Sequence, residues 1–133
     1  MKIKLRYLLT VAAVAFAGVV HAQAVVVVGA SSPAGNMTKE QVADIFSGRS
    51  TEFEPVDQVG GAIRDEFSSK VLGKSTTQMK AFWAKAAFTG KGNPPKELGG
   101  SADVKQAVAA NPKRVGYIEK SAVDGTVKVI LSP

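Results

Sequence analysis

Hydrophobic positions along the chain follow two periods, one typical of strands and one typical of helices. Residues 24–29 (AVVVVG) form an unbroken apolar and β-branched run, which predicts a strand buried on both faces. Segments 53–58, 115–118 and 126–131 predict three further strands. Pro55 marks the start or an exposed edge of the second strand, since proline cannot donate to a sheet.

Four segments between these runs have the spacing of amphipathic helices. Thr38 with Gln41 and Ser75 with Gln78 form capping boxes that predict where two of the helices begin, and Ser101 is expected to cap the last one. Residues 89–100 are expected to be a loop. The predicted inward stripes are Val42, Ile45 and Phe46; Ile63, Phe67 and Val71; Met79, Phe82, Trp83, Ala86 and Ala87; and Val104 and Val108.

The stripe that begins at Met79 is the clearest amphipathic pattern in the chain. We interpret it as part of the core and not as a binding groove, and Trp83 as a packing residue and not as a ligand platform. Helices that lie between short apolar strands predict a small α/β domain with at least some parallel pairing. No repeat or linker divides the chain, so a single domain is expected over residues 23–133.

The first 22 residues have the three parts of a secretory signal peptide. A basic start precedes an apolar run from Tyr7 to Val20, and small residues at Val20 and Ala22 predict cleavage after Ala22. The apolar run is shorter than the roughly 20 residues that span a bilayer, so a retained membrane anchor is the less favoured alternative. A protein exported in this way is expected to be periplasmic.

Composition excludes several kinds of site. The chain has no Cys, and its only His, His21, lies in the predicted signal peptide, so His and Cys catalysis and His- or Cys-ligated metals are not expected in the exported protein. The signal peptide also carries three basic residues and no acid, so its removal lowers the net charge from +6 to +3. Without a clustered basic face or a known module, nucleic-acid binding is not expected.

Several segments in order resemble the substrate-binding proteins of phosphate ABC transporters, particularly the short members with a single lobe. The resemblance runs from about Val25 to Leu131 and implies a periplasmic-binding-protein-like α/β fold, a single lobe with a small mixed sheet flanked by helices. The segments that carry it are 37–48 (MTKEQVADIFSG), 56–58 (VDQ), 61–67 (GAIRDEF), 81–83 (AFW), 88–92 (FTGKG), 94–97 (PPKE), 111–112 (NP) and 115–118 (VGYI).

The resemblance also implies where a ligand would lie. Full-length members have two lobes that close on phosphate, whereas 111 residues suffice for about one lobe. A second copy or another protein would then supply the opposite wall, or the ligand is held weakly or not at all. Similar proteins hold phosphate at a Ser-Gly-Thr turn, for which this chain has Gly61, Ala62 and Ile63, and they place a basic residue near the position of Asp57.

The candidate oxyanion site is the turn of Gly60, Gly61 and Ala62 before Arg64. Backbone amides at a helix start can donate to an anion, and an arginine there can pair with two of its oxygens. An ordinary tight turn and a solvated Arg64 are the alternatives. Asp57 either accepts a hydrogen bond from protonated phosphate, which would select against sulfate, or caps the turn that follows it.

Ser31 and Ser32 form a second candidate group after the first strand. Ligands of open α/β sheets bind beyond the carboxyl ends of strands, where these two hydroxyls are expected to complete the ring of donors. Polar residues in a turn before Pro33 are the alternative interpretation.

We therefore expect a secreted, non-enzymatic solute-binding protein for phosphate or a similar oxyanion, with no cofactor. Its expected partners are an ABC transporter permease or a second copy of the chain. The alternative is a periplasmic interaction or dimerisation module of the same fold that has lost its ligand. An enzyme would have to work with carboxylates such as Asp57, Asp65 and Glu66.

Overall fold

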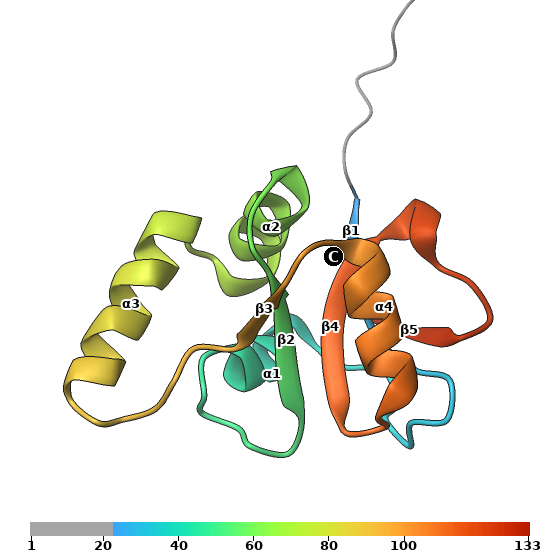
Figure 1. The fold of residues 1–133 in the computed structure, drawn as a ribbon, viewed down its shortest axis with the longest axis horizontal. Helices are drawn as coiled ribbons and strands as arrows, with labels where there is room; N and C mark the ends of the chain where they lie inside the picture. Colours follow the sequence, from blue (N-terminus) through green and yellow to red (C-terminus); the bar gives the residue numbers. More distant parts are fainter. Residues whose placement is uncertain (1–22) are drawn as a thin grey trace, which may run out of the picture.

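The computed structural model describes residues 23–133, and the predicted signal peptide lies outside them. A mixed sheet of five strands, in the order β3-β2-β4-β1-β5, forms the centre (Figure 1). Strand β2 is parallel to β3 and β4, whereas β1 is antiparallel to β4 and β5. The strands are β1 Ala24–Gly29, β2 Glu54–Gln58, β3 Lys96–Leu98, β4 Arg114–Glu119 and β5 Val127–Leu131.

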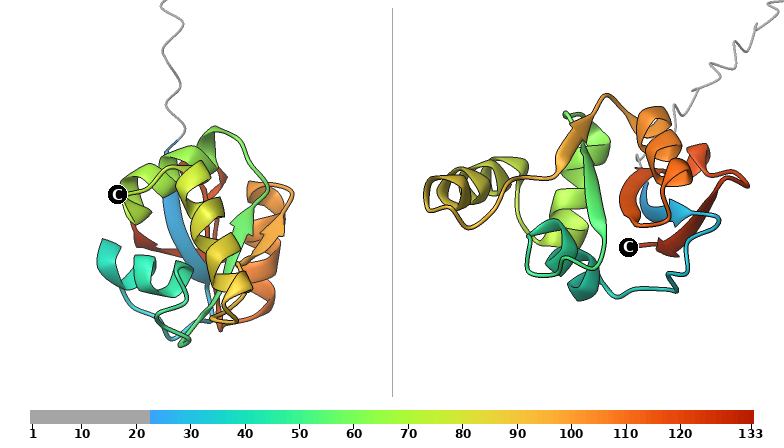
Figure 2. Two further views of the ribbon diagram at one scale, coloured as in Figure 1. Left: turned by 90° about the vertical axis from the view of Figure 1, so that its left-hand side faces the viewer. Right: turned by 60° about the horizontal axis from the view of Figure 1, so that its bottom comes forward.

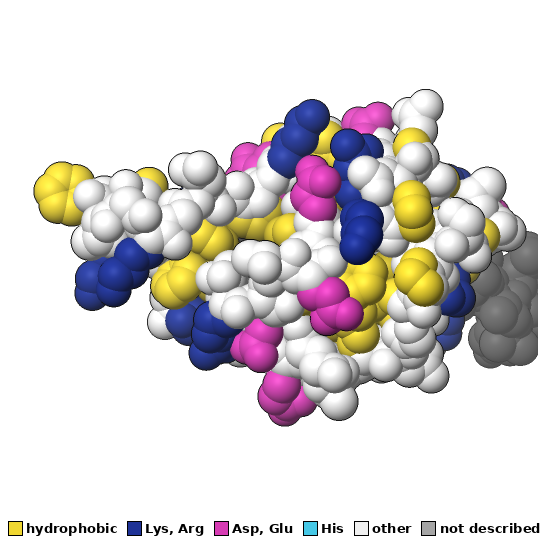
Figure 3. Space-filling view, turned by 90° about the horizontal axis from the view of Figure 1, so that it is seen from below, with side chains coloured by type: hydrophobic (Ala, Val, Ile, Leu, Met, Phe, Trp, Pro, Cys, Tyr) yellow, Lys and Arg dark blue, Asp and Glu magenta, His cyan; other side chains and the backbone are white. Residues whose placement is uncertain are grey.

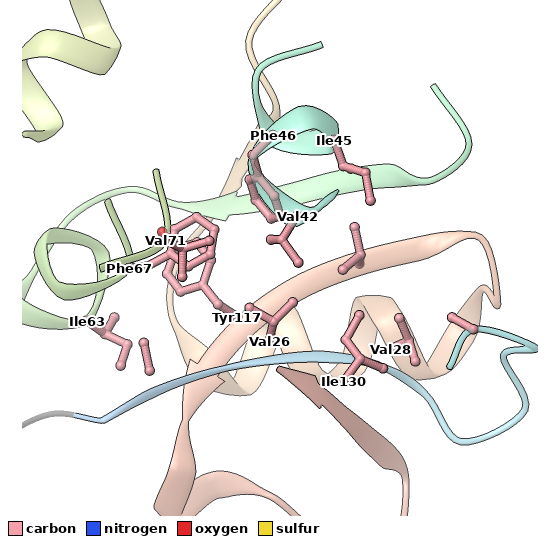
Figure 4. Packing of buried hydrophobic residues seen from close by; sticks show 13 residues of the cluster. Val26, Val28, Val42, Ile45, Phe46, Ile63, Phe67, Val71, Tyr117 and Ile130 are labelled. Atoms are coloured by element: carbon pink, nitrogen blue, oxygen red, sulfur yellow. The ribbon is translucent and has the colours of Figure 1, made fainter. Parts of the chain in front are cut away.

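Helices cover both faces of this sheet, as predicted. On one face α1 and α2, with the π-helical turn η1, cover a core that includes Val26 and Val28 of β1 (Figure 4). On the other face Val25 and Val27 pack with Val104 and Val108 of α4. The bounds are α1 Lys39–Phe46, α2 Ala62–Phe67, η1 Ser68–Leu72, α3 Thr76–Phe88, α4 Ser101–Ala110 and the 3-10 turn η2 Lys120–Ala122.

Most of the predicted helix starts are confirmed. The amides of Gln41 and Gln78 donate to the hydroxyls of Thr38 and Ser75, so both capping boxes are present. Ser101 is different, because Gly100 is the N-cap and Ser101 is already the first helical residue. The expected cap at Ser101 is therefore wrong.

The second predicted helix contains a change of pitch. Ile63, Phe67 and Val71 are all buried, but α2 widens into η1 at Ser68. Three residues at four-residue intervals drift around an α-helix of 3.6 residues per turn. The wider π turn keeps Val71 over the core, and Gly73 then ends the segment in a left-handed conformation (φ 66°).

Helix α3 does not belong to the core, and the interpretation of its stripe is wrong. Of its residues only Met79 is buried, Phe82 and Trp83 are half-buried, and Phe88 is 91% exposed. The helix extends from one edge of the molecule, away from both helical layers (Figure 2). Periodicity identified an apolar face, but nothing in the described chain covers that face fully.

Strand β3 is the other difference from the sequence prediction. Residues 96–98 lie within the expected loop, yet they pair in parallel with Val56 to Gln58 at the edge of the sheet. Three residues carry no detectable strand period, so only the tertiary pairing reveals this strand. Within residues 23–133, no helix combines the length and the apolar character needed to cross a bilayer.

Candidate functional site

The carboxyl end of β2 brings two of the predicted site residues together. Asp57 is the fourth residue of β2, and Arg64 lies in α2, which begins at Ala62. The Arg64 residue is only 6% exposed, and its Nη2 lies 3.7 Å from Oδ2 of Asp57. A buried guanidinium needs an anionic partner, and the Asp57 carboxylate is one such partner of Arg64.

Glu97 is a third member of the site that sequence reasoning missed. It lies on β3 directly opposite Asp57, and its Oε1 accepts a hydrogen bond from Arg64 Nη1 at 3.0 Å. Two carboxylates on neighbouring strands thus share one guanidinium. The Glu97 side chain is 43% exposed and that of Asp57 is 17% exposed, so Glu97 is the more accessible of the two carboxylates.

Tyr117 is the fourth member and was also missed. Its hydroxyl donates to Oδ1 of Asp57 and accepts from the amide of Gln58 at 3.2 Å. Its ring stacks on Phe67 with centroids 4.0 Å apart, which fixes the phenol between the sheet and α2 (Figure 4). Burial and the neighbouring Asp57 charge both raise the pKa of Tyr117 well above its usual value near 10.

This raised pKa predicts a loss of stability in alkali that Tyr117→Phe should remove. Above about pH 10 the unfolded state releases the phenol proton while the folded state retains it. The free energy of unfolding should therefore fall by up to about 1.4 kcal/mol per pH unit. Denaturant titrations at rising pH measure this slope. Equal slopes for the wild type and Tyr117→Phe would contradict the prediction. Because Tyr117 is the only tyrosine of residues 23–133, the absorbance of tyrosinate also measures its ionisation directly.

The predicted glycine turn lies beside this cluster. Gly60, Gly61 and Ala62 are exposed, and Gly61 is the N-cap of α2 with φ 95°, a conformation that favours glycine. The first amides of a helix have no acceptor inside it, so in this exposed turn they are left for water or a ligand. The side chains expected to carry hydroxyls in similar proteins are absent here, because the turn reads Gly61, Ala62, Ile63.

Ser31 and Ser32 lie at the other end of the sheet. They follow β1, which is antiparallel to β4, whereas Asp57 lies near the carboxyl end of β2, which is parallel to β4. The two serines therefore do not meet the other predicted site residues. Ser31 is exposed, and the buried Ser32 accepts the amide of Ala34 with its hydroxyl. These contacts match the turn that was the alternative interpretation of this segment.

A polar side chain of β2 joins the site to α4. The side-chain amide of Gln58 donates to the Tyr117 carbonyl at 2.9 Å and to the Ser101 hydroxyl at 3.4 Å. The same hydroxyl accepts from the amide of Glu119 at 3.2 Å. Ser101 thus joins the carboxyl ends of β2 and β4, and this role explains its position inside the helix.

Chemically, the cluster combines one buried cation with two carboxylates. An added oxyanion would meet a net negative charge as long as both carboxylates stay ionised and in place. Displacement of Glu97 into solvent leaves one guanidinium, one carboxylate and the amides of the turn. Such an arrangement fits an anion that itself carries a proton for Asp57.

Comparisons with known proteins agree with this geometry at the level of the fold. No family model matches the chain, and none of the curated proteins matches it. Solved structures do match: a phosphate ABC transporter substrate-binding protein of Clostridium perfringens with bound phosphate (TM-score 0.63, 21% identity) and an ABC-type phosphate transport receptor of Vibrio cholerae (TM-score 0.63, 22% identity). PstS of Borrelia burgdorferi matches at TM-score 0.55 and 12% identity.

Each match covers 81% of this chain but only 44 to 46% of the other protein. The chain thus spans less than half the length of the structures it resembles. The resemblance expected from the ordered sequence segments is confirmed for the fold, as are the mixed sheet and its flanking helices. The chain has the α/β fold of one lobe of a phosphate ABC transporter substrate-binding protein.

Proposed function

We propose that this protein is a secreted, non-enzymatic binding protein for phosphate or a similar oxyanion. The observation that carries the proposal is the buried Arg64 guanidinium beside the turn of Gly60 to Ala62, in the fold of phosphate-binding proteins. Oxyanions pair with guanidinium and with free backbone amides, and this end of the sheet offers both. An ABC transporter permease is the partner that this function calls for.

In this proposal the ligand competes with Glu97. The oxyanion takes the place of the Glu97 carboxylate at Arg64 Nη1 while Glu97, on the edge strand, turns into solvent. Asp57 keeps its position because Tyr117 and the Gln58 amide both donate to it. Its second oxygen, Oδ2, then accepts a hydrogen bond from a protonated phosphate and repels sulfate, which has no proton to donate.

The test is binding of phosphate to the wild-type protein and to Glu97→Gln. Removal of the competing charge should tighten the affinity for phosphate about tenfold or more, which corresponds to about 1.4 kcal/mol. Glu119→Gln, which removes an exposed carboxylate from the end of β4, should leave the affinity unchanged. Titration calorimetry measures the affinities, and thermal melts with phosphate, sulfate and chloride at equal ionic strength check the selectivity.

Failure of both wild type and Glu97→Gln to respond at millimolar phosphate would reject the proposed function. A wild-type response that Glu97→Gln leaves unchanged would reject only the competition. The two results can therefore be told apart.

We also propose that residues 1–22 direct export and are removed after Ala22. The basic start and the short apolar run support this. Mass spectrometry of the protein isolated from the periplasm should give a chain that begins at Gln23. A mature chain that retains the apolar run would contradict it.

A second candidate is an interaction module that has this fold but no ligand. It is favoured by the internal pairing of Arg64 with two carboxylates and by the turn at Gly61 to Ile63 without hydroxyls. This candidate would be favoured if neither the wild type nor Glu97→Gln bound phosphate and the protein formed a stable self-association or bound a partner.

A further inference from the structure

Helix α3 carries apolar side chains on two opposite sides. The side turned toward the body carries Met79, Phe82 and Trp83, and the ring of Trp83 lies over Gly48, where a Cβ would come within 3.2 Å of it. The opposite side, at helical spacing, consists of Thr77, Ala81, Ala84 and Phe88, all exposed. A helix that is apolar on opposite sides is usually covered on both of them.

The charge around this helix is one-sided. Residues 68–96 contain six lysines and no acid, whereas the rest of the described chain has eight basic and eleven acidic residues. Lys80 and Lys85 are exposed and flank the outer face of α3. The cover for this face should therefore combine apolar side chains with carboxylates.

Such a surface exists on the same molecule. A cavity of about 430 Å³ beside α1 has apolar walls from Met37, Ile45 and Phe53 and acidic residues at Asp44 and Glu52. We call it the acidic groove. Asp44 is paired with Arg49 at 2.9 Å, whereas Glu52 is exposed and forms no ion pair with any residue of the described part of the chain.

The acidic groove continues toward the side of α3 that carries Trp83. A second cavity of about 430 Å³ shares Ile45, Glu52 and Phe53 with it and extends to Trp83. Seen from below, hydrophobic side chains are exposed between the projecting helix and the body, with acidic side chains on the neighbouring surface (Figure 3). The helix and the acidic groove are thus neighbours on one face, which suits a reciprocal exchange between two copies.

We propose that two copies of this chain form a symmetric dimer in which the outer face of α3 from each copy lies in the acidic groove of the other. Phe88 enters the apolar part of the groove, and Lys80 and Lys85 approach Glu52. A two-fold axis repeats both contacts, so each copy gives one helix and one groove. The surface lies at the amino ends of β2 and β4, opposite the Arg64 site, and the dimer is independent of oxyanion binding.

The test is sedimentation velocity of the protein isolated from the periplasm after expression of the full chain. The wild type should sediment as a dimer at micromolar to sub-millimolar concentration. Phe88→Asp should raise the dimer Kd about tenfold or more. Its Tm should equal that of the wild type at concentrations where both are monomeric, because this side chain is 91% exposed in the single chain. Lys120→Glu, an exposed lysine on η2, is the matched control and should behave as the wild type.

A charge exchange makes the test specific for this pairing. Lys80→Glu/Lys85→Glu and Glu52→Lys should each be monomeric, because each places like charges in both contacts of the dimer. An equimolar mixture should form the heterodimer, since one contact is then native and the other has its charges exchanged. A monomeric wild type, a dimer that Phe88→Asp leaves intact, or a mixture that stays monomeric would each overturn the proposal.

Discussion

Replacement of Arg64 by Met should both remove the response to phosphate and lower the free energy of unfolding by about 3 kcal/mol. The substitution keeps a long side chain but leaves Asp57 and Glu97 side by side on β2 and β3 with no cation between them. Asp57 cannot turn away, because Tyr117 and the Gln58 amide bind it. Loss of one member of a buried ion pair costs more than the pair itself contributes, because the remaining charge stays partly desolvated.

Arg49→Met is the matched control for this experiment. Arg49 lies 2.9 Å from Asp44, close to the 3.0 Å between Arg64 and Glu97, but the Arg49 side chain is 71% exposed. Exposed pairs contribute between about 0 and 1 kcal/mol, so Arg49→Met should be nearly neutral in denaturant titrations. Similar losses for the two variants would show that the burial of Arg64 is not what makes its ion pairs important. Part of the loss should be recovered in Arg64→Met/Glu97→Gln, since one uncompensated charge is then gone.

Gly29→Ala should destabilise the fold by about 3 kcal/mol, at the upper end of the usual cost of overpacking, and lower Tm by at least about 10 °C. A Cβ at Gly29 would overlap the carbonyl oxygen of Val108 and lie 3.4 Å from Cα of Ala109. Both atoms belong to the backbone of α4, so no side-chain rotation relieves the contact. The helix would have to move away from β1, and its packing through Val104 and Val108 would loosen.

The control for Gly29 is another glycine changed to alanine. A Cβ at Gly125, between η2 and β5, meets no atom within 4 Å, so Gly125→Ala should leave Tm nearly unchanged. A mild effect at Gly29 would mean that α4 can shift on the sheet at little cost. In that case the contact between β1 and α4 would not be what sets the position of Ser101 beside the site.

Local patterns along the chain determine most of the secondary structure without any long-range contact. The β-branched run of β1 has to be buried on both faces, and the capping boxes at Thr38 and Ser75 satisfy their own helix starts within four residues. Such features depend on neighbours in the chain, so the sequence alone suffices to predict them. The α/β class followed from their order, and the ordered segments carried the resemblance that the fold confirms.

Tertiary structure decided which residues meet. Glu97 and Tyr117 join Asp57 and Arg64 only because β3 and β4 flank β2 in parallel, and strand pairing over such separations has no local signal. The antiparallel direction of β1 likewise placed Ser31 and Ser32 at the opposite end of the sheet. Periodicity showed that α3 has an apolar face, but whether that face is covered depends on the path of the whole chain. Residue types and spacing thus determine the elements, whereas direction, register and burial arise only when distant segments pack together.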